Sequence, residues 1–209
     1  MRASKPPPEV LDETCWSDEG FLQGILFTSA YGCYALAKTQ QEREAWRIAK
    51  TSRFKFMVIN PAMIIGPSLT PHLNFSLEVL LNLVKGHGAG LDICPPNTIP
   101  DAYKGWVDVR EVAEAHVLAL ERDDSEGRYL LQSSITHYAD VVEELRRHPA
   151  LSHYPALPLS SADGSRQAVK PKMNNSKMRA LGVKEISLQQ SLADSISSLE
   201  AAGFITPVQ

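Results

Sequence analysis

The stretch FKFMVINPAMIIGP (residues 54–67) decides the fold class of this chain. Its first part, residues 54–60, is a short, largely apolar run with aromatic and β-branched side chains that closes on Asn60-Pro61. Such a run predicts a strand buried on both faces, as in a parallel sheet. Pro61 sets a rigid turn after that strand, and the residues that follow, up to Pro71, are predicted to form turns.

A long helix is predicted on the N-terminal side of this strand, over residues 31–51. The segment consists mainly of Ala, Leu, Lys, Gln, Glu and Arg, which have high helix propensity. Ala45, Ile48 and Ala49 supply an apolar side. The polar residues Gln41, Glu42, Arg43 and Arg47 suit solvent. A helix, a buried strand and a proline turn are therefore expected to follow one another directly.

The remaining chain alternates predicted helices with short strands. Residues 1–20 and 149–172 are expected to be loops, because they are rich in Pro, Ser or Ala and show no clear period. Two more strands are predicted, at 104–109 and 127–133. Five more helices are predicted, at 74–86, 110–122, 138–147, 174–182 and 187–202. This alternation is typical of an α/β protein with a largely parallel sheet.

The composition argues against several function classes. A net charge of −3 gives no reason to expect nucleic acid or an anionic membrane as a partner. The longest apolar runs are broken by Pro and Gly well short of a bilayer span, and no apolar signal region follows the first residues. The three cysteines are odd in number and lack CxxC spacing, which favours reduced thiols. A cytoplasmic protein is expected.

No metal site is predicted. His116 lies in the predicted helix 110–122, and we expect it on the inner side of that helix as a core histidine. No second His, Cys or carboxylate has metal-ligand spacing with it.

The pentapeptide YALAK (34–38) carries the candidate chemistry. Tyr34 and Lys38 are four residues apart in a predicted helix, so both side chains lie on one face. An ammonium beside a tyrosine favours the phenolate form and helps the hydroxyl to exchange a proton, and it can also bind ribose hydroxyls. A solvated helix face is the simpler interpretation of the pentapeptide alone. The strand and turn that follow favour a site, because ligands of open α/β sheets bind beyond the carboxyl ends of strands.

Six segments together resemble the extended short-chain dehydrogenases/reductases, and within them the dihydroflavonol 4-reductase and cinnamoyl-CoA reductase group. They are DETCWSD (12–18), YALAKTQQEREAW (34–46), VINPAMIIGPSLTPHLNFS (58–76), WVDVREVAEAHV (106–117), GRYLL (127–131) and KMRALGV (177–183). The resemblance implies the C-terminal part of a Rossmann-like, doubly wound parallel sheet with a smaller, mostly helical substrate-binding region, the N-terminal βαβ half being missing. It implies one truncated domain over 1–209, with the catalytic helix and cofactor-side strand at about 31–67 and the substrate-binding region at about 68–209.

The resemblance also implies roles for individual residues. Tyr34 matches the tyrosine that protonates the carbonyl oxygen, and Lys38 matches the lysine that activates it and binds the nicotinamide ribose. Ser76 matches a position that approaches the cofactor phosphates. Four residues match the turn whose backbone contacts the nicotinamide carboxamide: Pro61, Ala62, Met63 and Ile64. Asp108 and Arg110 are expected to be structural.

Two parts of the family pattern have no match. The Gly-rich GxxGxxG loop that receives the cofactor pyrophosphate does not occur in these residues. The catalytic serine is also unmatched, because Ser4 is too close to DETCWSD and Ser29 is only five residues before Tyr34.

Three functions therefore stay open. The first is an NAD(P)H-dependent reductase of a dihydroflavonol, cinnamoyl-CoA or a related carbonyl compound, with NADP favoured by resemblance and NAD as the alternative. The second is a non-catalytic remnant that acts through interactions. The third is a nucleotide-sugar epimerase or dehydratase of the same superfamily. In each case strand 54–60 is expected to have one unpaired edge, which favours self-association.

Overall fold

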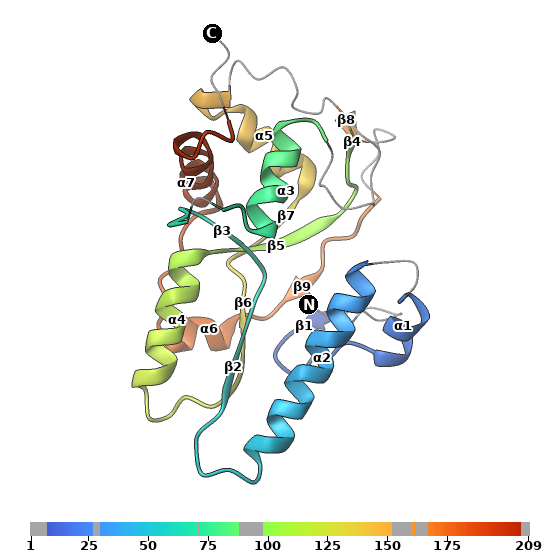
Figure 1. Ribbon diagram of the computed structural model, residues 1–209, viewed down its shortest axis with the longest axis vertical. Coiled ribbons are helices and arrows are strands. Elements are labelled where there is room, and N and C mark those ends of the chain that lie inside the picture. The colour runs from blue at the N-terminus through green and yellow to red at the C-terminus, as the bar shows by residue number, and fades with distance from the viewer. Residues whose placement is uncertain are drawn as a thin grey trace. The chain divides into compact units, whose positions relative to one another are not determined.

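A computed structural model describes residues 8–26, 30–70, 72–87, 98–151, 160–161 and 167–205 (Figure 1). The chain forms two compact units. The first unit comprises Met1–Asn60, Ala115–Leu131 and Pro171–Val183, and the second comprises Pro61–Glu114, Gln132–Lys170 and Lys184–Gln209. The single truncated domain expected over residues 1–209 stays a prediction.

The first unit is built around the long helix α2. Its elements are β1 (Val10–Leu11), α1 (Glu19–Gly24), α2 (Ala30–Ala49), β2 (Met57–Pro61, whose last residue belongs to the second unit), the second half of α4 (Val109–Glu121), β6 (Gly127–Leu131), β9 (Lys172–Met173) and α6 (Ser176–Leu181). β1 pairs with β9 in parallel, and β2 pairs with β6. Leu22 of α1 packs with Ala35 and Leu36 of α2 in a small apolar core.

The second unit contains the larger core. Its elements are β3 (Met63–Ile65), α3 (Phe75–Val84), β4 (Thr98–Ile99), β5 (Tyr103–Asp108), the first half of α4, β7 (Ser134–His137), α5 (Tyr138–Arg146), a 3₁₀ turn (Pro149–Leu151), β8 (Ser160–Ser161) and α7 (Leu188–Ala201). β5 is the central strand, parallel to β3 and antiparallel to β7. Helices α3, α5 and α7 contact one another and bury their apolar faces in this core (Figure 1).

The predicted helices and their ends are largely confirmed. The helix expected at 31–51 is α2, and the helix expected at 74–86 is α3. Asn74 caps α3 because its side-chain oxygen accepts the Leu77 N–H at 2.9 Å. Gly86 follows α3 with a φ of 72°, a conformation that glycine adopts without steric cost. Alternating helices and strands confirm the α/β class.

The strand predictions need correction. Residues 54–60 were expected to be buried on both faces, but β2 begins at Met57 and each of its residues is only half-buried. Among the described strands β2 pairs with β6 alone, so it also lies at an edge of its sheet. Residues 63–65 and 134–137 are strands that periodicity did not predict, and residues 1–20 contain β1 and the start of α1. The antiparallel pairing of β5 with β7 also departs from a purely parallel sheet.

Helix α4 presents a different face from the one expected. Its buried positions are Glu111, Ala115 and Ala119, which recur every fourth residue. His116 therefore lies on the exposed side, so the core-histidine prediction is wrong. Leu120 is 81% exposed.

No helix among the described residues combines the length and the apolar character needed to cross a bilayer. Ser4, Ser29 and much of the 149–172 loop lie outside the described residues.

Candidate functional site

Helix α2 carries Tyr34 and Lys38 on its exposed side. Ala35, Leu36 and Thr39 are the buried positions of this part of the helix, which leaves positions 34 and 38 outside. Tyr34 is 59% exposed, and Lys38 Nζ donates a hydrogen bond to Gln41 Oε1 at 3.3 Å. The common face predicted for the pair is therefore present, with both polar ends open to solvent.

Tyr31 lies one turn before Tyr34 and is half-buried. Burial raises the pKa of Tyr31, and the nearby Tyr34 raises it further. A phenolate at position 34 thus disfavours a second phenolate at position 31. The sequence prediction did not include Tyr31, although its i, i+3 spacing from Tyr34 was a usable signal.

The predicted cofactor turn lies at the junction of β2 and β3. Pro61 is the last residue of β2, Ala62 forms a bend, and Met63 and Ile64 open β3. Met63 is buried and pairs with Trp106 of β5. Ser76 Oγ lies 3.9 Å from Met63 Sδ, so the structure brings two of the predicted cofactor residues together.

The predicted residues divide between the two units. Tyr34 and Lys38 belong to the first unit, and Met63, Ile64 and Ser76 belong to the second. Within the first unit Tyr34 and Lys38 lie one turn apart on α2, and within the second unit Ser76 contacts Met63.

Asp108 and Arg110 form an ion pair where β5 meets α4, in which the carboxylate is buried and the guanidinium is exposed. Asp108 is 1% exposed and accepts hydrogen bonds from Arg110 Nε and Nη2, each at 2.8 Å, and from Ser191 Oγ at 2.7 Å. Burial alone would raise the pKa of Asp108, but the hydrogen bonds from Arg110 and Ser191 outweigh it and lower the pKa. Arg110 also donates to Asp194 at 2.7 Å. These bonds lie within the fold, in agreement with the structural role expected for the pair.

Glu111 completes this junction, and sequence reasoning missed it. Its carboxylate accepts hydrogen bonds from the Asp108 N–H at 2.9 Å and from Ser133 Oγ at 2.5 Å, and also from the Ile186 N–H. Asp108 Oδ1 in turn accepts the Arg110 N–H at 2.9 Å. This is a capping box, for which the D-x-x-E spacing at 108–111 was the available signal.

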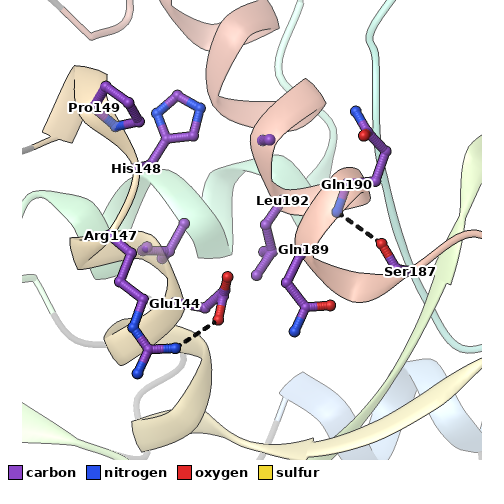
Figure 2. Close-up of a pocket in the computed structure, with 10 residues that line it drawn as sticks. Glu144, Arg147, His148, Pro149, Ser187, Gln189, Gln190 and Leu192 are labelled. Atoms are coloured by element: carbon purple, nitrogen blue, oxygen red, sulfur yellow. Dashed lines mark hydrogen bonds and ion pairs between the residues drawn. The ribbon is translucent and has the colours of Figure 1, made fainter.

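A cavity of about 330 Å³ lies between the C-terminal end of α5 and the first turns of α7 (Figure 2). Glu144 and Arg147 form an ion pair at 3.2 Å on its wall, and Ser187 Oγ accepts the Gln190 N–H at 3.2 Å. None of its lining residues is a predicted site residue. The cavity is therefore separate from the candidate chemistry. In the described part of the chain no three His, Cys, Asp or Glu side chains are placed to hold a metal ion.

Comparison with known proteins identifies relatives of this chain. It is 36% identical over 208 residues to cinnamoyl-CoA reductase 1 of Arabidopsis thaliana, an alignment that covers 99% of this chain and 56% of that protein. The structure of Gre2 from Candida albicans in complex with NADPH matches with a TM-score of 0.75 at 25% identity, covering 97% of this chain and 61% of that one. Vestitone reductase from alfalfa (Medicago sativa) matches with a TM-score of 0.73 at 23% identity, covering 94% and 60%.

These matches confirm the Rossmann-like α/β fold and the resemblance to the dihydroflavonol and cinnamoyl-CoA reductase group. The chain spans little more than half the length of each of these proteins. The model of the NAD dependent epimerase/dehydratase family matches residues 22–131, which is more than half of the chain. The chain therefore belongs to the NAD dependent epimerase/dehydratase family.

Proposed function

We propose that this chain supplies the catalytic helix and the substrate side of an NAD(P)H-dependent reductase that acts on a small carbonyl compound. The observation that carries the proposal is the pair Tyr34 and Lys38, which lie one turn apart on the exposed face of α2 with their polar ends open. The proposed substrate is cinnamoyl-CoA, which the name of the relative supports, or a dihydroflavonol or a related aldehyde or ketone.

Tyr34 acts as the acid in this proposal. When bound, a nicotinamide cofactor would supply a hydride to the carbonyl carbon. The Tyr34 hydroxyl gives its proton to the carbonyl oxygen, so that the C=O bond of an aldehyde or ketone becomes a C–H and an O–H bond. With a thioester such as cinnamoyl-CoA, the C–S bond of the resulting hemithioacetal then breaks, the thiol leaves and the C=O bond of an aldehyde forms. The Lys38 ammonium stabilises the phenolate that forms on Tyr34 when it gives up its proton. Lys38 first turns away from Gln41, which costs little because both side chains are exposed.

The same proposal assigns residues to the nicotinamide end of the cofactor. Lys38 would bind the nicotinamide ribose, and the backbone at Pro61, Ala62 and Ile64 would meet the carboxamide, since these three residues are only half-buried. Met63 is 4% exposed, so it would offer the cofactor far less surface than these three residues. Ser76 would approach the phosphates. We propose NADP as the cofactor, which the NADPH complex of Gre2 supports, with NAD as the alternative.

The pyrophosphate end of the cofactor has no matching Gly-rich loop in these residues. We therefore expect the isolated chain to bind NADPH weakly if at all. The experiment compares the isolated chain with a chimera in which the N-terminal residues of Arabidopsis thaliana cinnamoyl-CoA reductase 1 that lie outside the alignment are joined ahead of it. NADPH oxidation is followed with cinnamoyl-CoA and with a dihydroflavonol.

The expected result is turnover by the chimera, reduced about 10²–10⁴-fold in Tyr34→Phe, because a positioned proton donor contributes that much. Lys50→Met is the matched control for Lys38→Met, since Lys50 is also exposed and lies just beyond α2. A soluble, folded chimera without turnover would favour the non-catalytic alternative. An isolated chain whose addition enhances NADPH fluorescence at micromolar concentration would refute the expected weak binding.

Self-association through the free edge of β2 is a further part of the proposal, as is a cytoplasmic location. β2 carries Met57, Val58 and Ile59, yet among the described strands it pairs with β6 alone. An unpaired, apolar strand edge is a template for pairing with a second copy.

A further inference from the structure

Three serines share one face of α7. Ser191, Ser195 and Ser198 follow at i, i+4 and i+7, which places them in one row along the helix. Ser191 and Ser195 are 2% and 0% exposed, and the other buried residues of α7 are the apolar Leu192, Ile196 and Leu199. A buried hydroxyl in an apolar interface is costly unless it is hydrogen-bonded, so each of these serines needs partners.

The partners lie in the segment that follows β3. Ser195 Oγ accepts the backbone N–H of Gly66 at 2.7 Å and donates to the Ser191 carbonyl at 2.7 Å. Ser198 Oγ accepts the backbone N–H of Ser68 at 3.0 Å. Two successive turns of α7 thus hold the two residues on either side of Pro67.

The third serine holds the neighbouring strand. Ser191 Oγ donates to Asp108 Oδ2 at 2.7 Å, and Asp108 is the register partner of Ile65 in the parallel pair β3–β5. Gly66, with a φ of 115°, lies directly over this carboxylate, since a Cβ there would be 2.9 Å from Asp108 Oδ2. Through these hydrogen bonds, Ser191, Ser195 and Ser198 connect the carboxyl ends of β3 and β5 to α7.

We infer that Ser195 is a positioning residue for the cofactor turn, an inference that rests on the proposed function. β3 is only three residues long, and its first two, Met63 and Ile64, belong to the predicted nicotinamide contact. Gly66 directly follows β3, so its hydrogen bond to Ser195 restrains the C-terminal end of this short strand. Ser195 thereby limits the movement of Met63 and Ile64 without touching the cofactor.

The test uses Ser195→Ala, with Ser197→Ala as the matched control, because Ser197 is exposed on the same helix. Amide hydrogen exchange is measured on the full chain. We expect exchange in residues 63–68 to rise about tenfold in Ser195→Ala, because the Gly66 N–H loses its acceptor, with α3 and α5 unchanged. Ser197→Ala is expected to leave exchange unchanged. If Ser195→Ala does not fold, Ser198→Ala tests the row at the Ser68 N–H.

A second readout separates positioning from a purely structural role. In the active chimera, Ser195→Ala is expected to raise KM for NADPH about fivefold or more, with kcat changed less than twofold, because Tyr34 and Lys38 are untouched. Unchanged exchange at 63–68, or an unchanged KM for NADPH in an active protein, overturns the inference. If every variant including the parent lacks turnover, the proposed function fails, and the exchange result alone decides whether Ser195 holds β3.

Discussion

Lys38 donates its hydrogen bond to Gln41, three residues further along α2, while Tyr34 lies four residues before it on the same exposed face. The lysine is thus held by a partner that a ligand can replace. An exposed bond between two flexible side chains contributes little to stability, so it is not an obstacle to the proposed role of Lys38.

Gln41→Ala is predicted to leave the protein nearly unchanged. Because the bond is exposed, the free energy of unfolding is expected to change by less than about 0.5 kcal/mol. Turnover of the chimera is expected to stay within about twofold, whereas Lys38→Met lowers it about 10²-fold or more. Chemical denaturation and NADPH oxidation measure the two effects. A loss in Gln41→Ala as large as that in Lys38→Met would show that Gln41 itself is part of the site.

Gly66→Ala is predicted to destabilise the second unit. The φ of 115° is unfavourable for any residue with a Cβ, and the new methyl would meet the Asp108 carboxylate. We expect a loss of roughly 1–3 kcal/mol, measured by thermal and urea unfolding. Gly24→Ala is the control, because a Cβ at that position in α1 would meet no atom within 4 Å. It is expected to be neutral or to stabilise by up to about 1 kcal/mol.

Asp108 is predicted to contribute to acid unfolding. Its folded-state pKa lies below its ordinary value, so its contribution to stability is present above the unfolded pKa of about 3.9 and is lost as the pH falls through the lower folded value. Urea unfolding is measured for the parent and for Asp108→Asn between roughly pH 2 and pH 6, a range that includes the folded and the unfolded pKa of Asp108. The parent is expected to lose stability more steeply below about pH 4 than the variant. Parallel curves would contradict the prediction.

Arg128 is predicted to stabilise the first unit strongly. Its guanidinium donates to Glu42 Oε1 at 2.6 Å and to the carbonyls of Glu13 and Cys15, and it stacks on Trp16 at 4.1 Å from the ring centroid. Both ends of the Arg128–Glu42 pair are largely buried.

Arg128→Met leaves the Glu42 carboxylate and both carbonyls without this partner, so we expect a loss of roughly 2–4 kcal/mol. Arg47→Met is the control, because its ion pair with Glu44 is exposed. Its expected cost is below about 1 kcal/mol. If both variants lose the same free energy of unfolding in denaturant, then the buried Arg128 contacts stabilise the protein no more than an exposed ion pair does.

The β2 edge gives a prediction about association. Val58→Lys places a charge in β2, which pairs with β6 alone in the described part of the chain, and is expected to shift the protein toward monomer in sedimentation velocity. Leu120→Lys is the control, since Leu120 is a far more exposed apolar residue, on α4. If Leu120→Lys, and not Val58→Lys, abolishes association, then α4 and not β2 is the interface.

Local sequence rules predicted much of this structure. Helix α2 follows from propensity alone, α3 from its Asn74 cap and the glycine after it, and the α/β class from the alternation of both element types. These patterns depend on residues close together in the sequence, so they can be recognised without knowing how the rest of the chain folds. The prediction for His116 failed because α4 is apolar on more than one side, and periodicity did not tell which side meets the core.

The sequence by itself determined the family, the positions of Tyr34 and Lys38 on one helical face, and the order of helix, strand and turn. Only the tertiary structure decided that β3 exists, that β5 pairs antiparallel with β7, and that Ser195 meets Gly66 across 129 positions in the chain. The reason is physical: helix caps and propensities are local, whereas strand pairing and buried hydroxyl contacts depend on which distant segments the core brings together.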